Sequence, residues 1–324
     1  MSGTKLFDEH LEHNTMGAIV ASVATAAECG LLQALDETPR TAEALAAPLS
    51  LDGFACTRVL DVLTMVGMAE REGDGYRVAT RHAGERDPVM GLARAIELWR
   101  DLPRFLREGT GTHFTGRSSE RESAYASAVD SLGRLFGPLA QQLAESSPAV
   151  PGQGRVLDVG AGSGIWSLAM AQHDPRVKVT AFDLPKVTKV FEANAARRAL
   201  SDRVAVHPGD YHDDVGDLPG YDRVVLANVL HLENEDDGAA VVDRFARGLQ
   251  SGGDVVIVDA LPDDTPRSRL HTAAYALHLA LRTGRGQVHP EPRLRQWLAA
   301  AGLTHVTRVG LGEGGMAALV ARHA

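Results

Sequence analysis

The sequence predicts an α/β protein with a parallel sheet flanked by helices in its C-terminal part and a smaller, mostly helical domain before it. From about residue 155 onward, short apolar runs alternate with helical segments, the pattern that builds a parallel sheet. One of these runs leads directly into a glycine-dense turn and then a helix. Earlier in the chain, apolar residues recur at helical spacing between short polar turns. The sheet is therefore expected in the second half of the chain.

Composition narrows the class of protein. A chain of 324 residues with 44% hydrophobic content can bury a sizeable core. No stretch resembles a cleaved signal, and no run approaches the roughly 18 apolar residues of a membrane span, so we expect a cytoplasmic protein. The net charge of −9 argues against nucleic acid as a partner. Cys29 and Cys56 lack metal-site spacing and are expected to be buried free thiols.

The N-terminal part reads as helices followed by a hairpin. A first helix is expected from about Leu11 to Gly30, because glycine is a natural helix stop. Three shorter helices follow at 31–35, at 40–46 with a Thr41 cap, and from Asp52 through Val66. Strands at 68–72 and 76–79, joined by a glycine-rich turn, complete a winged helix.

A winged helix first suggests DNA binding. The last of its helices offers Arg58 but is otherwise mostly apolar, which favours a protein partner. We therefore expect this domain to mediate homodimerisation.

Two helices are expected next, from Val89 to Arg107 and from Glu120 to Ala144, and a Pro/Gly-rich boundary follows them. Trp99 and Phe105 are expected to line a substrate pocket or to belong to the core. The predicted organisation is a winged-helix dimerisation domain at 1–95, connecting helices that contribute to the substrate pocket at 96–150, and a catalytic domain at 151–324. In the last of these, strands are expected at 155–159, 178–183, 204–208, 223–227, 254–260 and 317–321.

The glycine-dense turn predicts a nucleoside-type cofactor. Asp158 and three alternating glycines, Gly160, Gly162 and Gly164, follow the first strand. Asp183, with Leu184 after it, lies roughly twenty residues on, where a second strand delivers a carboxylate to ribose hydroxyls. Ile165 stands where a dinucleotide fingerprint has its third glycine, which makes NAD a poor fit. S-adenosylmethionine, which has no phosphate, fits better.

Further polar residues follow the other strands. Gly209, Asp210 and Tyr211 come after the third strand, where a small residue admits the adenine and an acid accepts from its amino group. Asn228 comes after the fourth strand and precedes His231. Because imidazole has an ordinary pKa of about 6.5, His231 is the predicted general base. A core or helix-capping histidine is the alternative.

Two other residues leave their roles open. Asp259, near the end of the fifth strand, either orients the His231 imidazole or is a solvated strand-end carboxylate. His278, on an apolar helix, either bonds to substrate or is a satisfied core histidine.

These motifs resemble those of the bacterial and plant small-molecule O-methyltransferases, which join a winged-helix dimerisation domain to a Rossmann-like S-adenosylmethionine domain. The resemblance runs from about Gly17 to Val320. It rests on LDVGAGSG at 157–164, FDLP at 182–185, GD at 209–210 and NVLH at 228–231, with weaker agreement at 249–253 and 297–303.

The resemblance implies methyl transfer from S-adenosylmethionine to a hydroxyl of an aromatic or polyketide-like small molecule in secondary metabolism, by a homodimer without a bound metal. His231 falls on the family's base position, and Asp259 falls where a supporting glutamate often stands. Two departures concern the acid–base residues. The family's His-Asp-Trp is His-Leu-Glu at 231–233, and Gln287 replaces an expected glutamate.

Three alternatives remain open. The chain could be a C-methyltransferase, possibly metal-assisted, or a non-methylating enzyme on the same fold. His231, His278 and Asp259 could instead form a two-histidine, one-carboxylate iron site. From another class, the chain could be a cofactor-sensing regulator that signals through its winged helix.

Overall fold

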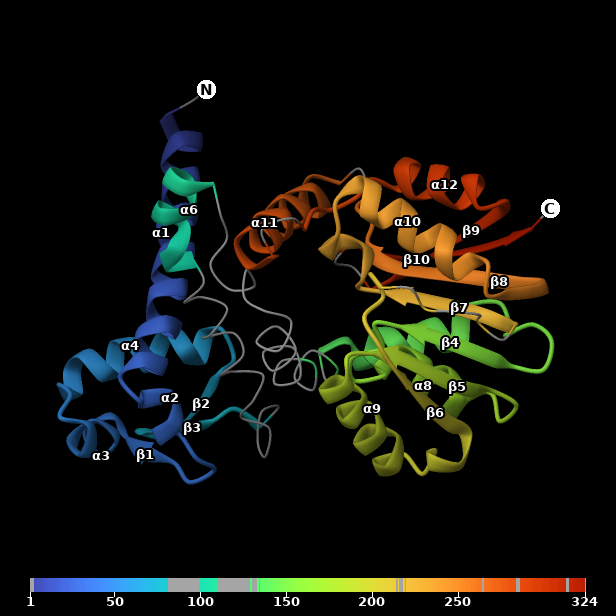
Figure 1. The fold of residues 1–324 in the computed structure, drawn as a ribbon. Helices are drawn as coiled ribbons and strands as arrows, with labels where there is room; N and C mark the ends of the chain where they lie inside the picture. The colour runs from blue at the N-terminus through green and yellow to red at the C-terminus, as the bar shows by residue number, and fades with distance from the viewer. Residues whose placement is uncertain are drawn as a thin grey trace. The chain divides into compact units, whose positions relative to one another are not determined.

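The structure is a computed structural model and divides into two compact units, Met1–Pro103 and Arg104–Ala324 (Figure 1). The residues that it describes are 3–80, 99–109, 129, 133, 135–213, 215, 218, 220–263, 265–283, 286–312 and 315–323, with side chains from residue 11 onward. The division at Pro103 falls inside the predicted connecting segment. Most of the two helices expected there lies outside the described residues, apart from α6 (Leu102–Glu108), a 3₁₀ turn before it at Trp99–Asp101, and a helix at 135–146.

The first unit has the predicted order of helices and hairpin. Its helices are α1 (Gly3–Glu28), α2 (Leu31–Ala34), α3 (Ala42–Ala46) and α4 (Gly53–Met65). Thr41 caps α3 by accepting from the Ala44 amide at 3.2 Å, and Asp52 caps α4 by accepting from the Ala55 amide at 2.8 Å. Gly30 has a φ of 79°, so the chain leaves α1 through a conformation that favours glycine.

A three-stranded sheet with the order β1-β3-β2 forms the wing, from β1 (Arg40–Thr41), β3 (Gly75–Val78) and β2 (Ala69–Glu72). The predicted helix at 40–46 therefore starts two residues late, because Arg40 and Thr41 pair with β3. Glu72 lies opposite Gly75, which leaves a two-residue hairpin loop whose first residue, Gly73, has a φ of 58°.

The two cysteines differ in environment. Cys56 is buried, as expected, and burial raises the pKa of its thiol. Cys29 is exposed, so the expectation that both thiols are buried is wrong for this residue. Cys29 directly follows the last residue of α1, at a helix end that the core does not cover.

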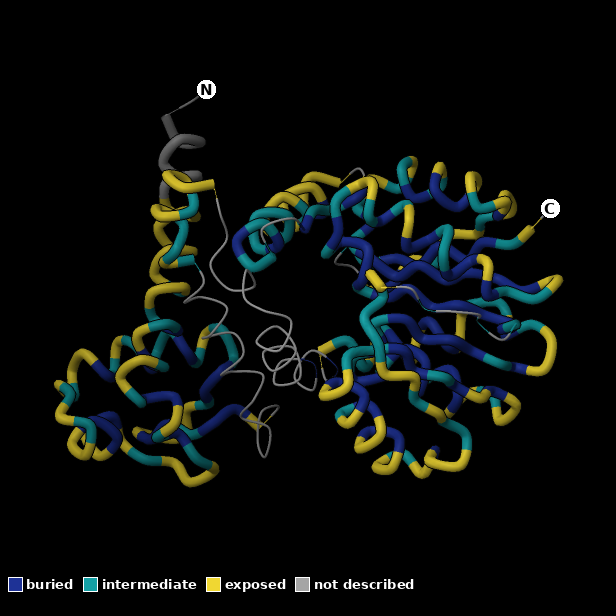
Figure 2. The backbone as a smooth tube through the Cα atoms, in the orientation of Figure 1, coloured by how far each residue is buried: buried dark blue, intermediate teal, exposed yellow. Residues whose placement is uncertain are grey.

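Large apolar side chains stay exposed on α1 and α4. Leu11, Met16 and Val20 on α1 are 52%, 52% and 47% exposed, and Phe54 and Met65 on α4 are 73% and 86% exposed. Figure 2 shows this exposure along α1. Although α1 has 26 residues, no helix in the described part of the chain is long and apolar enough to cross a membrane.

The second unit is a seven-stranded sheet with helices on both faces, in the order β6-β5-β4-β7-β8-β10-β9 (Figure 1). The strands are β4 (Arg155–Val159), β5 (Lys178–Asp183), β6 (Val204–Pro208), β7 (Tyr221–Ala227), β8 (Leu249–Ala260), β9 (Leu303–Leu311) and β10 (Met316–His323). The helices are α8 (Ile165–His173), α9 (Pro185–Arg197), α10 (Glu235–Ala246), α11 (Pro266–Thr283) and α12 (Glu291–Ala300). The predicted fold class is confirmed.

The prediction of a wholly parallel sheet is wrong at one edge. The strands from β6 to β8 pair in parallel, but β10 is antiparallel to both of its neighbours. The short connection at 312–315 is the physical reason, because adjacent parallel strands need a crossover of a dozen or more residues. The edge strand β9 was not predicted, and it is buried only at its two ends.

Both faces of the sheet are buried. Along β4, Val156 belongs to a core cluster with Leu143, Leu168 and Phe191, whereas Leu157 belongs to the cluster on the opposite face. That second cluster contains Phe245 of α10 and Trp297 of α12. The sheet is thus a rigid layer whose only exposed margins are its strand ends and edges.

A buried ion pair joins the beginning of β7 to β8. Arg223 Nε lies 2.7 Å from Asp254 Oδ1, Arg223 Nη2 lies 2.9 Å from Asp254 Oδ2, and the two side chains are 1% and 0% exposed. Arg223 also donates to the carbonyl of Pro148 at 3.0 Å, which ties the segment before β4 to the sheet. The bidentate geometry and the carbonyl contact satisfy charges that would otherwise be costly to bury.

Replacing Asp254 with alanine should lower the free energy of unfolding by about 3–5 kcal/mol, because Arg223 would remain buried without its partner. Denaturant unfolding measures the change. Asp243→Ala, which removes the exposed pair with Arg247, is the control and should cost no more than about 1 kcal/mol. Equal losses in the two variants would contradict the assigned role of the buried pair.

Candidate functional site

The carboxyl ends of β4, β5, β6, β7 and β8 lie along one edge of the sheet. The chain runs outward from β4 through β5 to β6 and then returns to the other side of β4 with β7. This reversal makes the edge between β4 and β7 a topological switch point, where ligands bind in open α/β sheets. The turns after these strands hold most of the predicted site residues.

The glycine-dense turn after β4 needs its glycines for two separate reasons. Gly160, Gly162 and Gly164 have φ values of 62°, 57° and 73°, a region that other residues rarely adopt. A Cβ on Gly160 would lie 2.7 Å from Val229 Cγ2, and a Cβ on Gly164 would overlap the Phe191 ring. The turn is therefore packed closely against its own neighbours, and α8 begins directly after it.

Two acids hold this turn. Asp183, half-buried at the end of β5, accepts from the Gly162 amide at 2.8 Å and from the Leu184 amide at 2.7 Å. Asp158 lies beneath the turn, 2% exposed, and accepts from the Ser167 hydroxyl. Burial raises the pKa of Asp158 to about 7, and the charge on nearby Asp183 adds to this effect.

The loops after β6 and β7 come next along the edge. A Cβ on Gly209 would lie 2.7 Å from Phe182 Cζ, so only glycine fits there. Asp210 accepts from the His212 amide at 3.0 Å, and the Tyr211 hydroxyl donates to Glu233 at 2.8 Å. Asn228 has a φ of 56°, and its backbone N–H donates to the Val258 carbonyl at 2.9 Å. A non-glycine residue in this conformation is a strained position at the site.

His231 and Asp259 form a buried pair. His231, in a 3₁₀ turn at Leu230–Leu232, has its Nδ1 2.8 Å from Asp259 Oδ1, and the residues are 5% and 4% exposed. The Asp259 carboxylate also accepts from the His231 amide at 3.2 Å and the Ala260 amide at 2.8 Å. Asp259 is therefore not the solvated carboxylate that was one expectation. An ionised Asp259 places the imidazole proton on Nδ1, which leaves Nε2 as a proton acceptor.

Tyr275 faces the other imidazole nitrogen, and the sequence did not single it out as an acid–base residue. Its hydroxyl lies 3.3 Å from His231 Nε2, and its ring meets the imidazole edge-on, with 5.5 Å between centroids. His278 stacks on Tyr275 at 6.2 Å and lies on the same face of α11. Burial lowers the pKa of His278 to about 4, with Arg282 and His231 adding to the effect.

The turn that carries His231 is held from below by the segment after α11. His289, 4% exposed, places its Nε2 3.1 Å from the Leu230 carbonyl and 3.2 Å from the Glu233 carbonyl. The Gln287 amide donates to the His231 carbonyl at 2.9 Å. Gln287 thus supports the turn through its backbone, although the sequence departs here from the glutamate that the family pattern has. No sequence signal indicated His289, because its partners are backbone carbonyls.

Three predicted residues are not gathered as an iron site. His231 contacts Asp259 and Tyr275, whereas His278 stacks on Tyr275. Within the ranges that the structure describes, no three His, Cys, Asp or Glu side chains are arranged to hold a metal ion. Trp99 belongs to the first unit and Phe105 to the second; both are half-buried, and their part in a substrate pocket stays a prediction.

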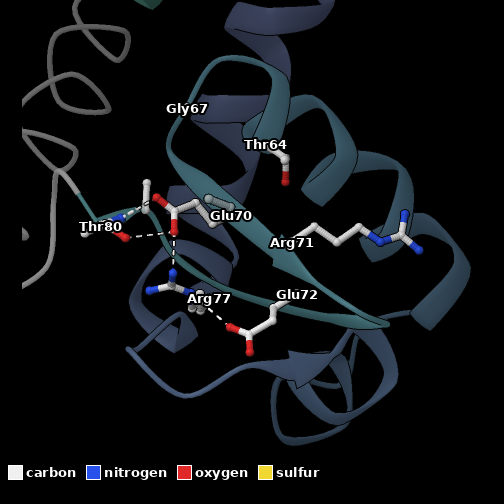
Figure 3. A pocket seen from close by; sticks show the side chains of 9 residues that line it. Thr64, Gly67, Glu70, Arg71, Glu72, Arg77 and Thr80 are labelled. Atoms are coloured by element: carbon white, nitrogen blue, oxygen red, sulfur yellow. Dashed lines mark hydrogen bonds and ion pairs between the residues drawn. The ribbon is translucent and has the colours of Figure 1, made fainter.

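A cavity of about 730 Å³ opens on the first unit (Figure 3). It lies beside the wing, and its charged side chains pair with one another or with near neighbours. Glu70 lies 2.6 Å from Arg77 and accepts from the Thr80 amide at 2.7 Å, and Arg71 lies 3.6 Å from Asp61. These pairs account for its charges, so the cavity offers no obvious catalytic group.

The comparisons with known proteins identify the family. Residues 108–304 match the family model of the O-methyltransferase domain. The chain belongs to this family. It is 28% identical over 265 residues to the tetracenomycin polyketide synthesis 8-O-methyl transferase of Streptomyces glaucescens, covering 76% of each chain. The resemblance inferred from the motifs is confirmed.

Two further similar proteins differ in the reaction for which they are named and in their sequence identity to this chain. The L-tyrosine C(3)-methyltransferase of Streptomyces lavendulae is 29% identical over 176 residues, which cover 54% of this chain and 44% of that protein. The human N-acetylserotonin methyltransferase, solved in complex with SAM, has the same fold. Its TM-score is 0.75 at 20% identity, over 100% of this chain and 98% of that one.

Asp158→Asn should make this methyltransferase family member more stable at pH 8 than the parent protein. The pKa of Asp158 is about 7 in the fold and 3.8 ordinarily, so the folded state keeps a proton that the unfolded state releases between these values. Its stabilising effect is therefore present below pH 3.8 and is lost as the pH rises through 7. The neutral amide keeps an acceptor for Ser167, and the gain should be about 1–4 kcal/mol.

Denaturant unfolding at pH 5 and pH 8 checks this expectation. The advantage of the variant should be much larger at pH 8. Asp202→Asn, at an exposed acid, is the control for a surface charge change. A variant that is less stable than the parent at both pH values would show that the charged carboxylate is needed beneath the turn.

Proposed function

We propose that this protein transfers the methyl group of S-adenosylmethionine to a hydroxyl of an aromatic or polyketide-like small molecule, with His231 as the general base. The observation that carries the proposal is the buried His231–Asp259 pair, which lies at the same sheet edge as the glycine-dense turn. Membership of the O-methyltransferase family supports the reaction type.

The residues along the edge fit S-adenosylmethionine. Gly160 and Gly209 pack so closely against Val229 and Phe182 that only glycine fits there, and their backbone is proposed to lie against the cofactor. Asp183, with Leu184 beside it, is held at the turn and is proposed to bind the ribose, whereas Asp210 and Tyr211 are proposed to bind the adenine. Gly162, Gly164 and Asn228 are proposed to shape the methionine end, and Asp158 supports the turn from below. The bound cofactor supplies an electrophilic methyl group.

The chain's own residues then act on the acceptor. His231 Nε2 would take the proton from the acceptor hydroxyl, while the bound cofactor would supply the methyl group to that oxygen and leave as S-adenosylhomocysteine. Asp259 stabilises the imidazolium that forms and keeps the ring in position. Correct placement of the two reactants can contribute about 7–11 kcal/mol, and a general base adds typically about 10²–10⁴-fold. Positioning is therefore the larger contribution.

The two departures from the family pattern leave this pair in place. Glu233 turns toward the loop after β6, where Tyr211 donates to it, and Gln287 contributes a backbone amide. The acid that contacts the His231 imidazole is Asp259, through Nδ1. We therefore propose that neither Glu233 nor the Gln287 side chain carries a proton in the reaction.

The acceptor class rests on relatives. The Streptomyces glaucescens protein is named for an 8-O-methylation in tetracenomycin polyketide synthesis, which favours a hydroxyl of a polyketide-like compound. The similarity to an L-tyrosine C(3)-methyltransferase keeps carbon methylation as the second candidate. The position of the new methyl group in the product decides between the two.

Calorimetry with S-adenosylmethionine and S-adenosylhomocysteine tests the cofactor, and mass detection of products from a panel of phenols and polyketides tests the acceptor. Binding of both nucleosides and a product heavier by one methyl group are expected. Absence of binding by either nucleoside would overturn the proposal.

His231→Ala should lower turnover by about 10²–10⁴-fold while the dissociation constant of S-adenosylmethionine stays nearly unchanged, because the imidazole acts on the acceptor. Steady-state kinetics and calorimetry give the two quantities. His271→Ala, at an exposed histidine of α11, is the matched control. Turnover equal to that of the parent would remove His231 from the mechanism.

We also propose that the first unit forms a homodimer through the exposed apolar side chains of α1 and α4. A Phe54→Glu, Met65→Glu double variant should be monomeric by light scattering under conditions where the parent is a dimer, because charge would enter the apolar contact. Leu270→Glu, at an exposed leucine of the second unit, should leave the dimer intact. A monomeric parent protein would contradict the proposal.

A further inference from the structure

We propose that Glu233 is a positioning residue that couples cofactor binding in the loop after β6 to the turn that carries His231. This inference rests on the proposed function, because it assigns the loop around Tyr211 to the adenine. It goes further in giving a role to the side chain at which the sequence departs from the family pattern.

Glu233 is a buried carboxylate that contacts two residues of the loop after β6. It is 5% exposed, accepts from the Tyr211 hydroxyl at 2.8 Å, and lies 3.3 Å from His212 Nε2. A carboxylate is costly to bury without donors, so these two contacts explain how an acid is tolerated here. The same contacts fasten the loop after β6 to the end of the turn that carries His231.

Tyr211 extends from this bond to the glycine-dense turn. A Cβ built on Gly160 would lie 3.8 Å from Tyr211 Cε1, which places the ring beside the turn. The Tyr211 carbonyl accepts from Arg244 of α10, and its ring lies 4.6 Å from that of His212 between centroids. The ring of Tyr211 thus borders the glycine-dense turn at Cε1, directly beside the hydroxyl that is bonded to Glu233.

The other end of the connection is the backbone of Glu233 itself. The Glu233 amide donates to the Leu230 carbonyl at 3.0 Å and closes the 3₁₀ turn that contains His231. The Glu233 carbonyl lies 3.2 Å from His289 Nε2. A shift of the Glu233 side chain would therefore move the turn that carries His231. Asp259 holds the His231 imidazole separately, through Nδ1.

The charges around His212 reinforce the bond. The hydrogen bond to Glu233 raises the pKa of His212 against the opposing effect of burial, and Asp210 and Asp237 add to the rise. A protonated His212 gives a charge-assisted bond to Glu233. This contribution is present below the ordinary histidine pKa and is lost as the pH rises through the higher pKa in the fold.

Hydrogen exchange with and without saturating S-adenosylhomocysteine tests the coupling without any need for turnover. The amides of Leu232 and Glu233, which close the turn, should exchange at least about fivefold more slowly when the nucleoside is bound to the parent protein. Tyr211→Phe and Glu233→Gln should each lose most of this protection at saturating nucleoside. Tyr221→Phe, at the opposite end of β7, should keep it.

The double variant separates coupling from two independent effects. If Tyr211 and Glu233 act through their mutual bond, the Tyr211→Phe, Glu233→Gln variant should lose no more protection and no more turnover than the worse single variant. A double variant in which the losses of the two single variants multiply would overturn the coupling. Single variants that both keep the protection seen in the parent would also overturn it. Thermal unfolding of each variant, required to match the parent, rules out a general loss of structure.

The same experiment distinguishes this inference from the proposed function. A parent protein that binds no S-adenosylhomocysteine overturns the proposed cofactor and the coupling with it. A parent that binds the nucleoside but shows no change in exchange at Leu232 and Glu233 overturns the coupling alone.

Discussion

The contact between His231 and Asp259 is the constraint on which the candidate site depends. It joins the turn after β7 to the end of β8, so the imidazole is fixed by two neighbouring strands of a buried sheet. The carboxylate receives two backbone amides in addition to the ring, which holds it rigid as well as buried. Tyr275 faces this imidazole with His278 stacked behind it, and His289 contacts the backbone carbonyls of the turn.

Much of the sheet could be predicted because its local signals are strong. β4, β5 and β6 have the predicted bounds, since each is a short run with a clear boundary at a glycine, an acid or a proline. The Thr41 cap and the start of a helix at Asp52 were predicted from equally local signals. The antiparallel β10 and the edge strand β9 were harder, because strand direction depends on the length of a connection and β9 alternates only weakly.

The sequence indicated which residues belong to the candidate site, but it did not indicate which of them contact one another. The strand ends indicated His231 and Asp259, yet their 2.8 Å contact depends on the register of β7 and β8, which one sequence does not contain. Tyr275 was not predicted as an acid–base residue, because its hydroxyl meets His231 across two elements that are far apart in the chain. Glu233 was noted only as a departure from the family pattern. Its hydrogen bond with Tyr211 joins two loops that are separate in the sequence, so the sequence alone did not indicate it.

β7 and β8 contain a buried ion pair in one part and residues of the candidate site at their carboxyl ends. Near the beginning of β7 and midway along β8, Arg223 and Asp254 form a pair that is closed to solvent and tied to the segment before β4. At their carboxyl ends the same strands present Asn228 and Asp259 to the candidate site. Because the ion pair anchors the strands from the far end, substitutions in the loops at the near end can accumulate without loosening the sheet. Such a division lets a lineage of enzymes change its substrates quickly while its scaffold evolves slowly.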